Sequence, residues 1–144
     1  MNLKVKSFSV GLGLGTIICY IAVFSLGYTS AIALPNPIYN WAKEYSAHLP
    51  VIFAWDLVVV QFLGIGILAA ISTFIVLKLT SLKWLYVAAG FLASDIIFSL
   101  ISLLNLPTLQ YISVLNLIMY LPHLIVVSIC VFYAAHFGAK NQKV

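Results

Sequence analysis

The sequence predicts an all-α integral membrane protein, a four-helix bundle with a short interfacial helix between spans 1 and 2. The composition is the first reason: 64% of the 144 residues are hydrophobic, 7% are charged, and the mean hydropathy is +1.15. A soluble domain is about half apolar and about a quarter charged, so these values exclude a water-soluble core. The second reason is that the chain contains four apolar runs, each long enough to cross a bilayer with about 20 residues. We expect residues 1–144 to form a single four-span membrane domain.

The four predicted spans cover approximately residues 8–33, 51–77, 84–104 and 109–137. All seven basic residues are Lys, and they are distributed unevenly among the segments that flank the spans. Pairs of Lys precede the first span, separate the second from the third and follow the fourth, whereas the other two connections carry only Lys43. The positive-inside rule then predicts that both termini and the middle connection are cytoplasmic. The expected location is the endoplasmic reticulum if the source is eukaryotic and the inner membrane if it is bacterial.

The stretch GLGLGT, residues 11–16, resembles a phosphate-binding loop only superficially. A dinucleotide loop needs G-x-G-x-x-G between a strand and a helix, and this spacing is absent. Gly11 and Gly15 are instead four residues apart on one helical face, which is the small-xxx-small pattern of close helix packing in membranes. The stretch therefore indicates helix packing, and the same face would allow a homo-oligomer through Gly11 and Gly15.

The segment between the first two spans predicts a short helix that lies on the outer membrane surface. Asn36 is a favourable helix cap and Pro37 suits the first helical position. Trp41 and Tyr45 recur at helical spacing, and such residues prefer the headgroup level. We expect this helix, over residues 37–48, to close the outer side of a cavity.

Polar residues inside the predicted spans are the candidate functional residues, because ionisable groups in a bilayer are costly. Asp56 lies about two turns into the second span and Asp95 near the middle of the third. The fourth span carries polar residues three or four positions apart. The predicted ligand-binding residues are Asp56, Asp95, Asn116, Tyr120 and His123. The alternative is that these groups hydrogen-bond to one another and only hold the helices together.

Other kinds of site have less support in the sequence. Cys19 and Cys130 lie in apolar runs, without a CxxC motif, and are interpreted as small packing residues. The His and Asp residues do not have the spacing of metal ligands, so no metal is expected, and no cofactor is expected either. The scattered Lys residues do not favour a nucleic acid as partner. The expected partner is a membrane lipid or a hydrophobic small molecule.

Several short stretches, in order along the chain, resemble the EXPERA-domain family, which includes the emopamil-binding protein (a sterol isomerase) and the sigma-2 receptor. Asp56 matches a position where these proteins carry a ligand-facing Glu, and Asn116 lies near a pocket Asn of the isomerase. The resemblance implies a four-span fold with cytoplasmic termini and an intramembrane ligand pocket. The similar stretches are LP at 34–35, WAKEY at 41–45, DLV at 56–58, KW at 83–84, GFLASDIIF at 90–98 and YLPHLI at 120–125.

One departure from the family pattern bears on the reaction. Family members carry a carboxylate in the outer part of the first span, where this chain reads Gly-Tyr-Thr-Ser at 27–30. Isomerisation needs an acid and a base, so Asp56 would have to work with Asp95 or His123. The resemblance therefore favours binding of a sterol-like or other amphiphilic lipid or amine, and whether the protein is an enzyme stays open. The alternatives are an EXPERA-type lipid double-bond isomerase, a small structural or immunity-type subunit of a membrane complex, and a proton or ion pathway.

Overall fold

A computed structural model of the chain describes residues 2–104 and 114–140. It confirms the predicted fold class. All regular secondary structure in the described part is helical, and four of the helices are long and apolar enough to span a membrane. The elements are α1 (Leu3–Ser30), α2 (Asn36–Glu44), α3 (His48–Trp55), η1 (Asp56–Gly66), α4 (Ile67–Leu79), α5 (Trp84–Leu104) and α6 (Val114–Lys140). Elements α3, η1 and α4 follow one another without a break and together form the second span, His48–Leu79.

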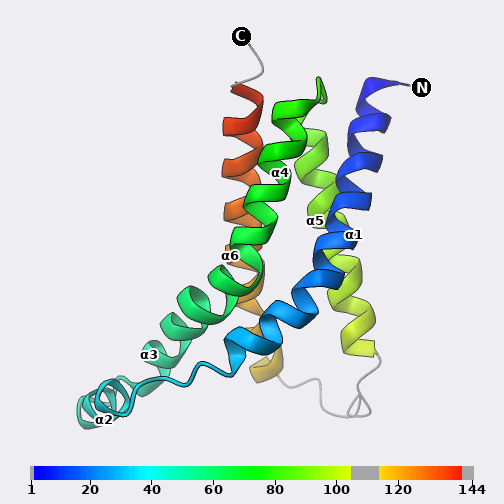
Figure 1. The fold of residues 1–144 in the computed structure, drawn as a ribbon. Helices are drawn as coiled ribbons and strands as arrows, with labels where there is room; N and C mark the ends of the chain where they lie inside the picture. Colours follow the sequence, from blue (N-terminus) through cyan, green and yellow to red (C-terminus); the bar gives the residue numbers. More distant parts are fainter. Residues whose placement is uncertain (1, 105–113, 141–144) are drawn as a thin grey trace.

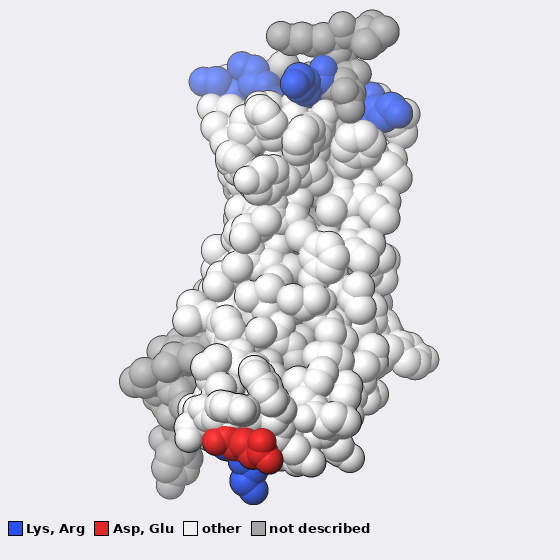
Figure 2. All heavy atoms as spheres, turned by 90° about the vertical axis from the view of Figure 1, so that its left-hand side faces the viewer, with Lys and Arg blue, Asp and Glu red and all other residues white. Residues whose placement is uncertain are grey.

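The two chain ends and the connection between α4 and α5 lie at the same end of the bundle, and α2 lies at the other (Figure 1). Lys side chains gather at the end that carries the termini, and the face in Figure 2 shows an uncharged band between them and the charged residues of the opposite end. Large hydrophobic side chains such as Ile17, Phe24 and Leu79 are exposed. An exposed apolar surface of this extent fits contact with lipid.

The tightest helix contact joins the first half of α1 to α5. A Cβ atom on Gly11 would lie 2.1 Å from the Val87 carbonyl oxygen, and one on Gly90 would lie 2.2 Å from the Phe8 carbonyl oxygen. Gly15 packs in the same way against Phe91. The glycines therefore allow the two backbones to touch, as the small-xxx-small pattern requires. In the structure, Gly11 and Gly15 contact α5 of the same chain. A homo-oligomer formed through this helical face stays a prediction.

Ser7 joins the beginnings of the same two helices. Its side chain is fully buried, its hydroxyl donates to the Leu3 carbonyl oxygen at 2.7 Å, and it accepts a hydrogen bond from the Lys83 backbone N–H at 3.0 Å. Lys83 directly precedes α5, so its N–H is one of the amides that the start of a helix leaves without a partner. Ser7 thus caps α5 from a different helix.

The remaining core is apolar and lies between α1, α4, α5 and α6. The main members of this cluster are Ile18, Ile65, Leu77, Val87, Phe91, Val127 and Val131. Gly138 of α6 permits close contact with α4, since a Cβ there would lie 3.1 Å from the Leu77 side chain. In a bilayer such packing replaces the hydrophobic effect as the source of helix association.

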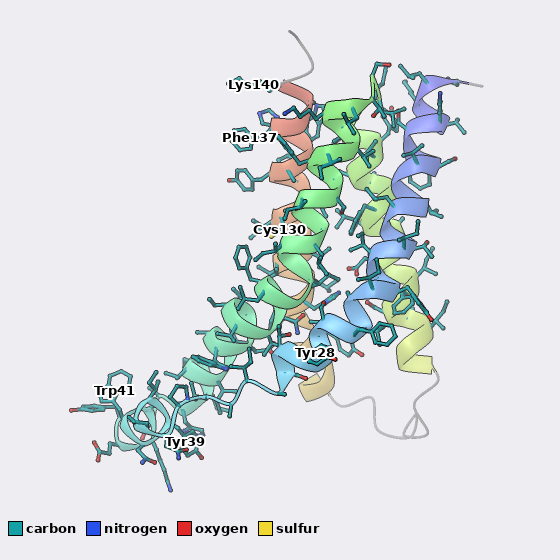
Figure 3. The ribbon with its side chains drawn as sticks, viewed as in Figure 1. Tyr28, Tyr39, Trp41, Cys130, Phe137 and Lys140 are labelled. Atoms are coloured by element: carbon teal, nitrogen blue, oxygen red, sulfur yellow. The ribbon has the colours of Figure 1, made fainter. Side chains whose placement is uncertain are left out.

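Helix α2 lies apart from the bundle and packs against α3 (Figure 1). Asn36 is the first residue of this helix and not its cap, because Pro35 takes the capping position without a side-chain hydrogen bond. The rings of Trp41 and Tyr45 are exposed and in contact, with centroids 5.5 Å apart. Figure 3 shows Tyr39 and Trp41 at the far tip of the molecule, which suits an interfacial anchor.

Candidate functional site

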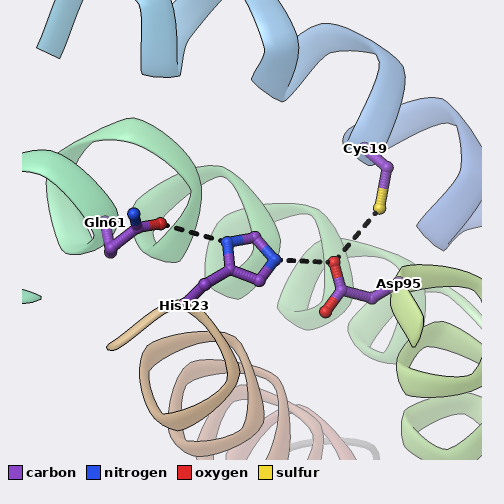
Figure 4. A network of polar contacts seen from close by, with 4 residues as sticks. All are labelled: Cys19, Gln61, Asp95 and His123. Atoms are coloured by element: carbon purple, nitrogen blue, oxygen red, sulfur yellow. Dashed lines mark hydrogen bonds and ion pairs between the residues drawn. The ribbon is translucent and has the colours of Figure 1, made fainter. Parts of the chain in front are cut away.

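Four polar side chains, one from each spanning segment, meet inside the bundle (Figure 4). They are Cys19 of α1, Gln61 of η1, Asp95 of α5 and His123 of α6. The four are connected by hydrogen bonds in the order Gln61, His123, Asp95, Cys19. We call this group the polar network.

His123 is the central member of the polar network because both of its ring nitrogens have partners. Nε2 lies 3.0 Å from Asp95 Oδ1, and Nδ1 lies 3.0 Å from Gln61 Oε1. The His123 side chain is 14% exposed and the Asp95 side chain 3%. Such a pair, held in a medium of low dielectric, interacts more strongly than it would in water.

Asp95 receives a second contact from α1. The Cys19 thiol donates a hydrogen bond to the same oxygen, Oδ1, at 3.4 Å. Cys19 is buried, as expected for a small packing residue, and its thiol in addition contacts Asp95. Among the described residues, the other Asp95 oxygen has no hydrogen-bond partner. A carboxylate oxygen can accept a hydrogen bond.

Gln61 reaches the polar network because the second span is π-helical between Asp56 and Gly66. In an α-helix, residues five apart point about 140° away from each other. The i→i+5 bonding of a π-helix brings such residues onto neighbouring turns of one face. Asp56 and Gln61 are five residues apart and therefore lie on one face of this π-helical segment.

Hydroxyl groups of α1 contact the backbone of η1. Thr29 Oγ1 donates to the Val60 carbonyl oxygen at 3.0 Å, and Ser25 Oγ donates to the Gly64 carbonyl oxygen. The two donors are four residues apart in α1 and the two acceptors are four residues apart in η1, so hydroxyls on successive turns of α1 meet carbonyls about one turn apart in η1. Gly64 permits this approach, since a Cβ there would lie 2.7 Å from Thr29 Oγ1. These bonds stabilise the π-helical segment that carries Gln61.

A cavity of about 340 Å³ lies beside the polar network and is open on one side. This volume is at the lower end of the range for small-molecule sites. Val23, which is 53% exposed, lines the cavity, so the opening reaches the lipid-facing surface of α1. Its apolar lining is Ala22, Val23, Leu26, Ile65 and Phe98, and its polar lining is Cys19, Gln61, Asp95, Ser99, Tyr120 and His123.

The structure brings three of the five predicted site residues to this cavity: Asp95, Tyr120 and His123. Asp56 does not belong to the described lining of the cavity. The Asn116 side chain is outside the described part of the chain. None of the described lining residues comes from α2, so the expected closure of the cavity by residues 37–48 is not seen.

Two members of the site, Gln61 and Cys19, were not predicted as functional. Gln61 carried a usable signal, because it is a lone amide inside the apolar run VVVQFLG at 58–64. Cys19 carried no such signal, since buried cysteines are common in apolar helices.

Among the residues that the structure describes, no group of three His, Cys, Asp or Glu side chains is arranged to hold a metal ion. Comparisons of the chain with protein-family models, with characterised proteins and with solved structures give no match. The four apolar spans define the class: the chain is a polytopic integral membrane protein.

Proposed function

We propose that this protein binds an amphiphilic lipid, sterol-like or of another kind, in the cavity beside the polar network. The observation that carries the proposal is the His123–Asp95 pair in the wall of a cavity that opens to the lipid-facing surface. Apolar side chains such as Leu26 and Phe98 would hold the body of the ligand. The polar end of the ligand would meet the Asp95 carboxyl group, Tyr120 and Ser99, as is usual for largely apolar sites with a few placed polar groups.

A relationship to the EXPERA family is part of this proposal. The order of spans and the acidic residues in the second and third spans support it. The structure also gives the first span a different role at the place where the family has a carboxylate. There, Thr29 donates to the backbone of η1. The polar end of a ligand would thus meet Asp95 and His123 in place of a pair of carboxylates.

A mutation at the mouth of the cavity tests the binding proposal. Val23→Trp would place a large ring across the opening without overfilling the core, because Val23 is largely exposed. Ile21→Trp is the matched control, since Ile21 is 45% exposed on the same helix and does not line the cavity. We expect a bound lipid in native mass spectra of the gently extracted parent and Ile21→Trp proteins, and its loss in Val23→Trp. Equal lipid retention in all three proteins would contradict the proposal, and a co-purifying protein in place of a lipid would favour the subunit alternative.

A lipid double-bond isomerase is a second candidate, favoured by the 3.0 Å contact between His123 and Asp95. Double-bond migration removes a proton at one carbon and adds a proton at another, so no other reactant is needed. A hydrogen-bonded imidazole and carboxylate can serve as the two proton-transfer groups. Conversion of an unsaturated sterol to a double-bond isomer by purified protein, abolished in His123→Gln, would favour the enzyme. Binding of the sterol without any product would favour the binding protein.

We further propose that the Lys-rich end faces the cytoplasm, as the positive-inside rule predicts. Cysteines introduced at Ser81, beside α5, and at Asn40, in α2, test this orientation because both positions are exposed. We expect a membrane-impermeant thiol reagent added from outside to label Asn40→Cys and not Ser81→Cys. The reverse pattern would invert the orientation.

A further inference from the structure

The end of the bundle that carries the chain termini is basic and has no acidic side chain. All the described Lys residues there are exposed, and none of them forms an ion pair within the described part of the chain. The chain has three acidic residues: Glu44 is in α2 at the opposite end, and Asp56 and Asp95 lie within the spans. The protein itself therefore does not neutralise the charge of this end. The Lys residues concerned are Lys4, Lys6, Lys78, Lys83 and Lys140.

Two of these Lys residues are brought together where α1 and α5 begin. The Lys4 ammonium group lies over the Tyr86 ring, with Nζ 5.8 Å from the ring centroid, which is within the range of a cation–π interaction. Lys83 donates its backbone N–H to the Ser7 hydroxyl of α1, and its carbonyl oxygen accepts from the Tyr86 N–H at 3.1 Å. We call Lys4, Lys83 and Tyr86 the lysine corner. Its two Lys residues come from different helices and are held at one place by these contacts.

An exposed apolar surface adjoins the lysine corner. Phe8 and Leu12 follow Lys4 at intervals of four residues, so they lie on the same side of α1, and both are exposed. Leu85 is exposed in the first turn of α5. Going from the end of the bundle toward its middle, positive charge is thus followed by apolar side chains. A phospholipid has the same order, with its charged head group outside and its acyl chains inside.

We propose that the lysine corner binds the head group of an anionic phospholipid, whose acyl chains lie along Phe8, Leu12 and Leu85. Ammonium groups form charge-assisted hydrogen bonds with phosphate oxygens, and basic residues beside a membrane span attract anionic lipids. An acidic protein or a nucleic acid would use the charge of this surface but not its apolar part. No residue of the corner lines the cavity, so this site is separate from the proposed function.

The first test compares two phospholipids with the same acyl chains, dioleoylphosphatidylglycerol and dioleoylphosphatidylcholine. The first carries a net negative charge and the second has none. Each lipid is added to the full-length protein in detergent, and native mass spectrometry measures its binding. We expect the parent to prefer phosphatidylglycerol, and we expect this preference to fall as salt is added, because salt screens the charges. Equal binding of the two lipids would overturn the proposal.

Two double variants with the same loss of charge locate the site. Lys4→Gln/Lys83→Gln removes both charges of the lysine corner, and Lys78→Gln/Lys140→Gln removes two charges of the same end from α4 and α6. One Lys near an anionic surface strengthens binding about fivefold. We therefore expect the corner variant to lower the ratio of the two lipid affinities by about tenfold or more, and the other variant to lower it much less. Equal losses would overturn the corner as the site.

Two controls separate the lysine corner from other modes of binding. Glycerol 3-phosphate has the charged group without acyl chains, so we expect it not to displace phosphatidylglycerol at equal concentration. Val23→Trp obstructs the cavity and should leave phosphatidylglycerol binding unchanged. Displacement by glycerol 3-phosphate would show a site for soluble anions, and loss of binding in Val23→Trp would place the lipid in the cavity. Either result would overturn the proposal, whereas failure of the cavity to bind any lipid would not affect it.

The exposure of the substituted side chains makes the variants suitable for this comparison. Because Lys4, Lys78, Lys83 and Lys140 are exposed, we expect unchanged melting temperatures in detergent without added lipid. If Lys4→Gln/Lys83→Gln does not fold, Lys4→Gln is compared with Lys78→Gln, and the expected loss is about fivefold for the first and much smaller for the second. Lys4→Arg/Lys83→Arg keeps both charges and should keep the preference for phosphatidylglycerol. Loss of the preference in this variant would overturn recognition by charge.

Discussion

The two halves of the α1–α5 pair are held together in different ways. In the first half, Gly11, Gly15 and Gly90 bring the backbones into direct contact. In the second half, Cys19 reaches Asp95 by a side-chain hydrogen bond, and the cavity lies beside them. Thr16, which bonds Ser94 at 2.9 Å, marks the change between the halves. Small residues close the space between helices, whereas longer polar side chains leave room for a ligand.

The largest effect should follow from breaking the glycine contact. Gly11→Leu forces side-chain atoms into the Val87 backbone. Overpacking usually lowers the free energy of unfolding by about 1–3 kcal/mol, and we expect this variant to lie at or above the upper end of that range. Gly13→Leu is the matched control, because a Cβ there meets no atom within 4 Å. Thermal unfolding in detergent measures both. Equal melting temperatures for the two variants would show that this half does not depend on backbone contact.

An intermediate effect should follow from breaking the polar half. Asp95→Leu removes the acceptor of both His123 and Cys19 and should cost about 1–3 kcal/mol, the penalty for leaving buried polar groups without partners. Ser99→Ala is the control, one turn further along α5 and also in the cavity lining. Denaturation of the purified variants gives both values. If Asp95→Leu is as stable as Ser99→Ala, the polar network does not stabilise the fold, and its residues serve only as the lining of the cavity.

The smallest effect should follow from removing one hydroxyl between α1 and η1. Thr29→Val keeps the shape of the side chain but removes the bond to the Val60 carbonyl oxygen, and should cost about 0.6 kcal/mol, the average for such bonds in membranes. Ser30→Ala serves as the reference, because the Ser30 hydroxyl bonds only to Gly27 within its own helix. A loss that is no larger for Thr29→Val than for Ser30→Ala would mean that the hydroxyls do not stabilise the π-helix.

The site was predictable in part. Asp95 and His123 are conspicuous in the sequence because placing an ionisable group inside a bilayer costs free energy. Both belong to the polar network, and Tyr120 lines the same cavity. The prediction that Asp56 contacts a ligand came from the cost of a carboxylate in the bilayer and from the family resemblance, and it stays a prediction. The described lining of the cavity contains Gln61 of the same π-helical segment and not Asp56.

The sequence by itself determined the class of this protein: the low charge, the four apolar runs and the glycine spacing are properties of composition and period, and they depend on no distant contact. Only the tertiary structure decided which polar groups meet. Hydrogen bonds between Cys19, Gln61, Asp95 and His123 join four different spans, and the helical form of the second span depends on donors from α1. Such contacts depend on how each helix is rotated and wound within the bundle, and local sequence patterns do not specify that rotation.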